Sequence, residues 1–167
     1  MSTIKTMTID GFYSKEEAQR LSNVILELPF VKSEFGKEIE NFNMVPENAN
    51  TLFSGVLNKN MEVIEESSGV FRLPELFIHF ESFQNSNEWM FVVALENSTF
   101  NLFEHQLGAK NALEGYEHNY RNLFEWDLTV NYLLEPGQGI FFRPWLFHTF
   151  DSGLIQTFRL KENVNRI

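Results

Sequence analysis

Apolar residues recur at helical spacing in the first third of the chain. Residues 14–28 open with Ser14 and Glu17 in the spacing of a capping box and end at Pro29, which predicts one amphipathic helix. Its apolar face consists of Ala18, Leu21, Val24, Ile25 and Leu28. The same spacing predicts a second helix from about 47 to 66. Both helices need an apolar surface to cover.

After Gly69 the pattern changes to the alternation typical of β-strands. Turns rich in Asn, Ser, Gly and Pro separate the candidate strands. Strands are predicted at 76–83, 89–95, 99–103, 124–134, 139–142, 146–150 and 155–160. The polar stretch between Glu104 and Arg121 is expected to form a long loop at one mouth of the fold. Two helices followed by many short strands favour a mostly β (α+β) sandwich or jelly roll with the helices packed on one sheet.

The length of 167 residues fits one domain, 1–167, with a helical part at about 1–68 and a jelly-roll core at about 69–161. The formal net charge of −10 and the lack of a basic patch argue against nucleic acid and membrane surfaces as partners. Without cysteine, the chemistry must use carboxylates, imidazoles and hydroxyls. The N-terminus lacks a signal core, so we expect a soluble, cytoplasmic protein.

Four polar residues stand in apolar strand settings. His79 and Glu81 project from the same face of one predicted strand, His148 lies among bulky residues, and Arg159 follows eleven positions later. Each also has an ordinary structural explanation. His79 and Glu81 could hydrogen-bond each other, and His148 could be a core histidine whose hydrogen bonds are satisfied. Arg159 could form an ion pair at the surface. Together, two imidazoles and a carboxylate match the facial triad of non-haem Fe(II) sites. An arginine on a neighbouring strand can bind a distant carboxylate in bidentate fashion.

The order of these residues resembles the Fe(II)/2-oxoglutarate-dependent oxygenases. The motif His-x-Glu at 79–81, the distal His148 and the later Arg159 follow the family's order, and the Pro136-Gly137 turn is similar to its turn before the distal histidine. The opening IDGFYSKEEAQRL looks like that of prolyl-hydroxylase-like members. The resemblance spans nearly the whole chain, although 30–75 and 105–125 match nothing diagnostic.

The resemblance implies a double-stranded β-helix and a dioxygenase, a hydroxylase, acting on a peptide, amino acid or small metabolite with release of succinate and CO2. His79, Glu81 and His148 would ligate Fe(II), Arg159 would bind the far carboxylate of 2-oxoglutarate, and ascorbate could serve as reductant. Glu81 departs from the usual Asp. The serine expected two positions after the arginine is replaced by Lys161.

Several assignments stay open. Tyr132 and Thr149 are candidates for the absent hydroxyl, and Trp145 and Arg143 for substrate contact, with core packing the alternative for Trp145. His105 and His118 are expected to be solvated loop residues, with replacement of His79 as a ligand the alternative. Two other classes also fit: a cupin-type metalloprotein that does not use 2-oxoglutarate, and a non-catalytic jelly-roll binding module. Substrate identity and oligomeric state are not determined by the sequence.

Overall fold

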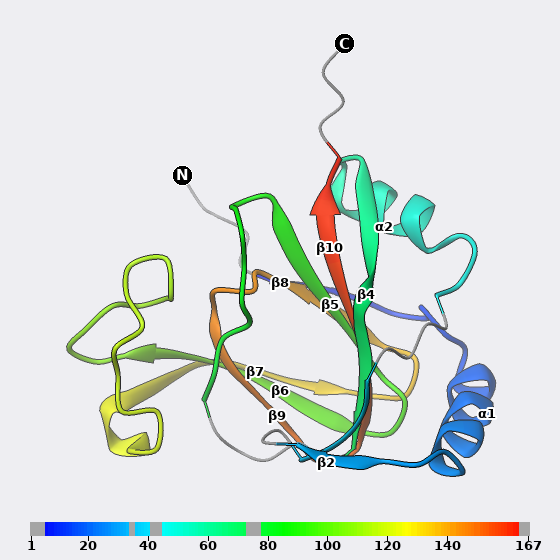
Figure 1. Cartoon of the computed structure of the whole chain (residues 1–167), viewed down its shortest axis with the longest axis horizontal. Helices are drawn as coiled ribbons and strands as arrows, with labels where there is room; N and C mark the ends of the chain where they lie inside the picture. Colours follow the sequence, from blue (N-terminus) through cyan, green and yellow to red (C-terminus); the bar gives the residue numbers. More distant parts are fainter. Residues whose placement is uncertain (1–5, 34–35, 41–44, 73–77, 164–167) are drawn as a thin grey trace.

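The computed structural model describes residues 6–33, 36–40, 45–72 and 78–163. Helix α1 spans Lys15–Leu26 and helix α2 spans Ala49–Leu57 (Figure 1). A single 3-10 turn, Leu123–Glu125, precedes β7. The strands are β1 Thr6–Ile9, β2 Val31–Ser33, β3 Gly36–Glu40, β4 Met61–Arg72, β5 Glu88–Ala94, β6 Ser98–His105, β7 Trp126–Leu134, β8 Gly139–Phe142, β9 Phe147–Asp151 and β10 Leu154–Glu162.

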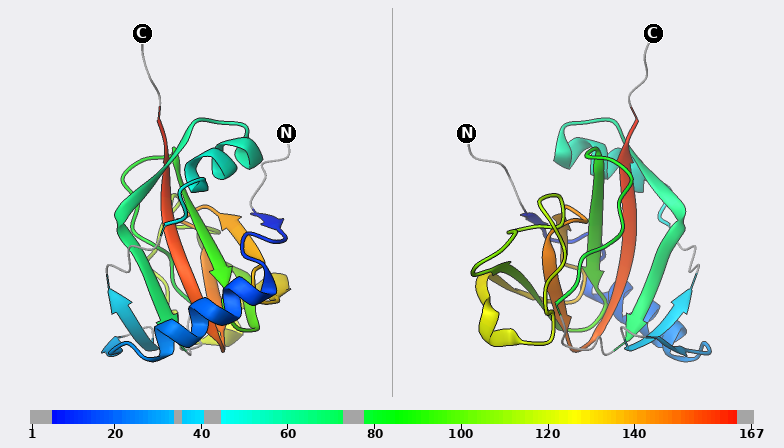
Figure 2. Two further views of the ribbon diagram at one scale, coloured as in Figure 1. Left: turned by 90° about the vertical axis from the view of Figure 1, so that its right-hand side faces the viewer. Right: turned by 60° about the vertical axis from the view of Figure 1, so that its left-hand side comes forward.

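The strands form two antiparallel sheets. The large sheet has the order β1-β8-β5-β10-β4-β3-β2, and the small sheet has the order β7-β6-β9. One apolar cluster joins Met90 and Val92 of β5 to Phe100 and Leu102 of β6. The two sheets therefore pack face to face over a shared core, as the two views of Figure 2 also show.

The helices cover the other face of the large sheet. A second apolar cluster combines Ile25 of α1 and Phe53 of α2 with Phe91 of β5 and Phe158 of β10. Because side chains alternate along a strand, Phe91 faces the helices while its neighbour Val92 faces the small sheet. The large sheet is thus buried on both faces, which explains the continuous apolar run of β5.

The prediction of α1 is confirmed, including its capping box: the Glu17 amide donates to Ser14 Oγ and the Ser14 amide donates to Glu17 Oε1. The predicted strands from 89 onward are also confirmed to within a few residues at each end. No described helix has the length and apolar content needed to cross a membrane.

The second predicted helix, 47–66, is wrong in its later half. Helix α2 ends at Leu57, where Asn58 adopts a left-handed conformation with φ of 53°. From Met61 the chain forms β4, which pairs with β10. The region 1–68 therefore contains strands β1 to β3 and the start of β4 as well as the two helices.

The strand predicted at 76–83 is also not formed in its described part. Residues 76–77 lie outside the described residues, and from Ile78 onward the only β pairing in that segment is one bridge between His79 and His148. Physically, the segment leaves sheet geometry because the Glu81 amide donates to the carbonyl of Pro144, a residue outside any strand, at 2.8 Å.

Gly137 is required by the turn that precedes β8. Its φ is 93°, and a β-carbon there would overlap the carbonyl oxygen of Tyr13, a residue just before α1. We expect Gly137→Ala to lower the free energy of unfolding by at least about 2 kcal/mol, because it adds both an unfavourable φ and a backbone clash. Denaturant unfolding measures the change.

Gly55 is the matched control, since it lies within α2 and a β-carbon there meets nothing within 4 Å. Gly55→Ala should be neutral or stabilising by roughly 0.5–1 kcal/mol. Equal losses in both variants would contradict the assignment of strain to Gly137.

Candidate metal centre

Three potential metal-ligating side chains meet between the end of the segment 78–81 and the start of β9. The Nε2 atom of His79 lies 3.3 Å from Glu81 Oε1, and the Nε2 atom of His148 lies 3.7 Å from the same oxygen. One donor atom from each residue lies within 4.8 Å of the others. The donor set is therefore two imidazoles and one carboxylate gathered about one point.

Backbone hydrogen bonds bring this cluster together. The amide of His79 donates to the carbonyl of His148 at 3.1 Å, and the amide of His148 donates back to His79 at 2.9 Å. Two residues further on, the Glu81 amide donates to Pro144. The segment is thus fastened at both ends of the motif to the chain that leads into β9, so His79 and Glu81 face His148.

His148 is fully buried and its ring orientation is fixed. Its Nδ1 lies 2.8 Å from the Leu146 carbonyl oxygen, so Nδ1 carries the proton and donates it there. Its Nε2 is buried without a hydrogen-bond partner among the described residues. A buried, unprotonated nitrogen that is aimed at a carboxylate and another imidazole fits a metal ligand whose outer nitrogen is anchored to a carbonyl.

The charges of the cluster suit cation binding. Burial alone would raise the pKa of Glu81, but its contacts with His148 and His79 outweigh burial and hold that pKa well below its usual range. Burial lowers the pKa of His148, and the charge of His79 adds to the effect. Near neutral pH the carboxylate is therefore ionised and His148 is neutral, which are the protonation states that ligate metals.

Arg159 of β10 reaches the same cluster. Its Nη2 lies 4.0 Å from Glu81 Oε2, and its Nη1 donates to the Ser82 carbonyl at 2.5 Å and to Ser82 Oγ at 3.4 Å. The structure thus brings together the four polar residues His79, Glu81, His148 and Arg159. The hydroxyl beside the guanidinium belongs to Ser82. Sequence reasoning did not select this residue, because a regular strand would turn Ser82 away from His79 and Glu81.

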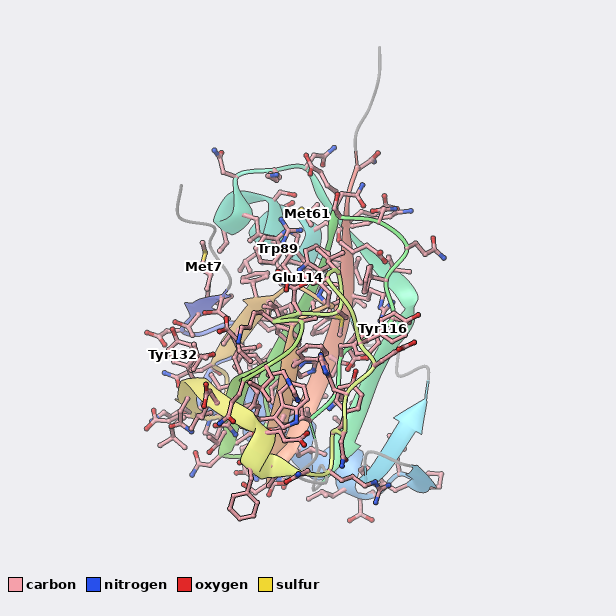
Figure 3. All side chains as sticks on the ribbon, turned by 90° about the vertical axis from the view of Figure 1, so that its left-hand side faces the viewer. Met7, Met61, Trp89, Glu114, Tyr116 and Tyr132 are labelled. Atoms are coloured by element: carbon pink, nitrogen blue, oxygen red, sulfur yellow. The ribbon has the colours of Figure 1, made fainter. Side chains whose placement is uncertain are left out.

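The other candidates lie elsewhere. Thr149 accepts a hydrogen bond from the Asn101 amide at 3.1 Å inside the small sheet. Tyr132 lies at the opposite side of the molecule from Tyr116, a residue of the long loop (Figure 3). Arg143 stacks over Trp89 at 3.8 Å and donates to the carbonyls of Ser86 and Glu88.

Trp145 is buried in the core between the sheets, and the long loop packs on the residues next to the cluster. Trp145 packs edge-on against Phe83 with ring centroids 5.5 Å apart, and its carbonyl accepts the amide of Ala112. Tyr116 packs against Phe80, the residue between His79 and Glu81, at 5.4 Å. The segment between Glu104 and Arg121 is irregular, as predicted, and it contacts the immediate neighbours of the cluster.

His105, at the end of β6, pairs with His118 of this loop, and neither joins the cluster. Their rings stack at 4.2 Å, and His105 Nε2 lies 3.4 Å from Glu125 Oε2. The Nδ1 of His105 accepts the amides of Leu107 and Gly108. The expectation of solvated loop residues is wrong for His105, which is buried because Trp126 and His118 cover its ring.

The cluster should depend on Glu81 for metal binding. Glu81→Gln keeps the side-chain volume but removes the anionic donor, so we expect the affinity for Mn(II) or anaerobic Fe(II) to fall by at least about 100-fold. Isothermal titration calorimetry measures this. Glu125→Gln is the matched control, because Glu125 also contacts a histidine. Equal affinities of Glu81→Gln and the parent protein would exclude the cluster as the metal site.

The histidine stack should make the loop sensitive to acid. Burial lowers the pKa of His118, and the charge of His105 lowers it further, whereas Ala109 and Glu125 oppose the shift. A lowered pKa means that the neutral form stabilises the fold, so this contribution is present above about pH 6.5 and is lost as pH falls below it. The thermal midpoint of the parent protein should therefore drop more between pH 7.5 and 5.5 than that of His118→Phe. Identical drops would contradict this role of His118.

Comparison with known proteins finds similarity in structure alone. No protein-family model matches the chain, and no curated protein sequence matches it. Solved structures do match: HygX from Streptomyces hygroscopicus with nickel, 2-oxoglutarate and hygromycin B bound has a TM-score of 0.62 at 9% identity, over 95% of this chain and 82% of HygX.

Two proteins of nogalamycin biosynthesis match to a similar extent. The non-haem alpha-ketoglutarate-dependent epimerase SnoN has a TM-score of 0.64 at 10% identity, over 95% of this chain and 76% of SnoN. The carbocyclase SnoK has a TM-score of 0.62 at 12% identity, over 95% and 79%. At these identities the comparison establishes a shared fold, which is mainly β, with antiparallel sheets and two helices. Within this fold, the chain has a His-Glu-His group that could hold a metal.

Proposed function

We propose that the chain is an Fe(II)- and 2-oxoglutarate-dependent dioxygenase that hydroxylates a peptide, an amino acid or a small metabolite and releases succinate and CO2. The observation that carries the proposal is the convergence of His79, Glu81 and His148 with Arg159 beside them. The fold would be a double-stranded β-helix forming one domain over 1–167. The structural neighbours that hold nickel or Fe3+ together with 2-oxoglutarate support it.

The donor set fits Fe(II) better than the common alternatives. Two imidazoles and one carboxylate with open positions are typical of non-haem Fe(II) oxygenases. Thiolate ligands are excluded because the chain has no cysteine. Glu81 is one methylene longer than an aspartate, yet its Oε1 already lies within 3.7 Å of both imidazole nitrogens, so the longer side chain is accommodated.

In this proposal His79, Glu81 and His148 would hold the metal, which when bound would supply the activation of O2 and the oxidation of a C–H bond. The protein's own contribution is orientation and exclusion of water. The Leu146 carbonyl fixes the ring of His148. Phe142 and Phe100 pack beside that ring, with centroids 4.6 Å and 6.0 Å away, and keep solvent from its inner side.

Arg159 would bind the far carboxylate of 2-oxoglutarate. Its guanidinium is largely buried, with 15% of the side chain exposed, and a buried guanidinium beside a single carboxylate can bind a second one in bidentate fashion. The substrate would approach past the exposed ring of Tyr116, with Trp145 packed behind Phe83. Arg143 would act there indirectly, by holding Trp145 and Trp89 in place.

One observation favours a second candidate, a cupin-type metalloprotein that does not use 2-oxoglutarate. Arg159 lies 4.0 Å from Glu81, so its charge already has an acidic neighbour without any cosubstrate. Under that alternative Arg159 would serve only to balance the charge of Glu81, and activity would not require 2-oxoglutarate.

Turnover of 2-oxoglutarate separates these functions. With Fe(II) and ascorbate, the parent protein should convert 2-oxoglutarate to succinate, and Arg159→Ala should raise KM for 2-oxoglutarate by at least about ten-fold, because a buried carboxylate contact is lost. NMR of succinate measures the rate. Arg121→Ala is the control, since Arg121 is an exposed residue of the long loop.

A KM unchanged by Arg159→Ala would favour the cupin-type alternative. Failure to take up any transition metal anaerobically would favour a binding module without catalysis.

A further inference from the structure

One edge of the small sheet is free for pairing. Strand β7, yellow in Figure 1, lies at the end of the order β7-β6-β9, and among the described strands it pairs only with β6. After a register shift opposite Leu102 and Phe103, residues 130–134 pair regularly with β6. In this regular stretch, alternate residues direct their amide and carbonyl groups away from β6, where no described strand meets them.

Exposed apolar side chains gather along this edge. Among the described residues, five of the eleven exposed large apolar side chains lie within positions 123–133. Because successive residues of a strand point to opposite faces, the exposed Tyr132 and Leu133 present apolar surface on both sides of the edge. An exposed apolar edge of this kind is a template for pairing with another chain. The five residues are Leu123, Phe124, Leu128, Tyr132 and Leu133.

The charge along this edge is entirely negative. From 122 to 135 the chain carries Glu125, Asp127 and Glu135 and no lysine or arginine. Glu135 lies 3.8 Å from Lys15, but both side chains are more than half exposed, so this ion pair contributes little. A second copy of the chain would bring the same acidic edge and a net charge of −10, whereas a basic segment would be attracted.

A small cavity adjoins the edge on the side of β1. Asp10 is the one charged residue that lines it, and its Oδ1 accepts the side-chain amide of Gln138 at 2.8 Å, a neutral donor that leaves the negative charge in place. The cavity thus combines apolar walls from β7 with a carboxylate, which fits the methylenes and the charged end of a lysine or arginine. Its volume is about 150 Å³, and its lining is Thr8, Asp10, Tyr132, Leu133, Leu134 and Gln138.

We propose that the edge of β7 receives an extended basic segment of a partner polypeptide as an additional strand, with a cationic side chain of that segment in the cavity at Asp10. Backbone hydrogen bonds to residues 130–134 hold the segment, and its apolar side chains cover Tyr132 and Leu133. Tyr132 lies across the molecule from Tyr116 of the long loop (Figure 3). The surface is therefore separate from the metal centre and binds its partner whether or not a metal is present.

Fluorescence anisotropy with a labelled peptide of alternating valine and lysine residues tests strand addition. The parent protein should bind this peptide at least about ten-fold more tightly than the same peptide with glutamate in place of lysine, because the edge is acidic. N-methylation of the peptide's backbone amides should also weaken binding at least about ten-fold, because it removes the donors to β7 and keeps the charge.

Leu133→Ser and Asp10→Asn locate the site. Each should weaken binding of the valine–lysine peptide by at least about three-fold, since the first loses apolar surface and the second loses the carboxylate of the cavity. Leu113→Ser is the matched control, because Leu113 is also an exposed leucine but belongs to the long loop, and it should leave the affinity unchanged.

A parent protein that does not bind the valine–lysine peptide, or binds its N-methylated form equally well, overturns strand addition. Unchanged affinity in Leu133→Ser, or an equal loss in Leu113→Ser, overturns the assignment to β7. A parent protein that is dimeric by light scattering and becomes monomeric in Leu133→Ser has a second copy on this edge, which overturns the basic partner.

Discussion

The candidate site depends on one pair of backbone hydrogen bonds, those between His79 and His148 at 3.1 Å and 2.9 Å. They join two segments almost seventy residues apart and are made by the same residues whose side chains form the cluster. A side-chain contact between flexible segments would lose rotamer and loop entropy on forming. Here the backbone fixes the separation of the two imidazoles, and the buried packing of Phe142 and Phe100 on His148 makes that arrangement rigid.

The same constraint explains the electrostatics. The pKa of the Glu81 carboxyl stays low despite its burial, because the two imidazoles beside it favour the charged form. Burial lowers the pKa of His148, so this imidazole does not take up a proton that would cancel the charge of Glu81. The result is a preformed anionic oxygen with neutral nitrogen beside it, and a bound cation would be stabilised by both.

Sequence reasoning succeeded where a local pattern determines structure. Ser14 and Glu17 specify the start of α1 by themselves. Short apolar runs bounded by turn residues specify the strands from 89 onward, because each has at least one face in the core between the sheets. Sequence reasoning failed at Met61–Arg72, where the spacing of apolar residues fits a helix and a strand equally well. There the pairing with β10 determines that a strand forms. His79, Glu81, His148 and Arg159 could be named because their order resembles that of the Fe(II)/2-oxoglutarate-dependent oxygenases. Ser82 and the His105–His118 stack could not, because both depend on irregular backbone.

The molecule as a whole is acidic, whereas Arg159 and Lys161 of β10 line a cavity of about 390 Å³. At physiological salt, interactions between exposed charges are screened beyond about 8 Å. The net charge of −10 is therefore weakly felt inside a cavity lined by Arg159 and Lys161, whose own fields act at contact distance. The position of Arg159 relative to the cluster is then determined by β10 and by the His79–His148 bridge together.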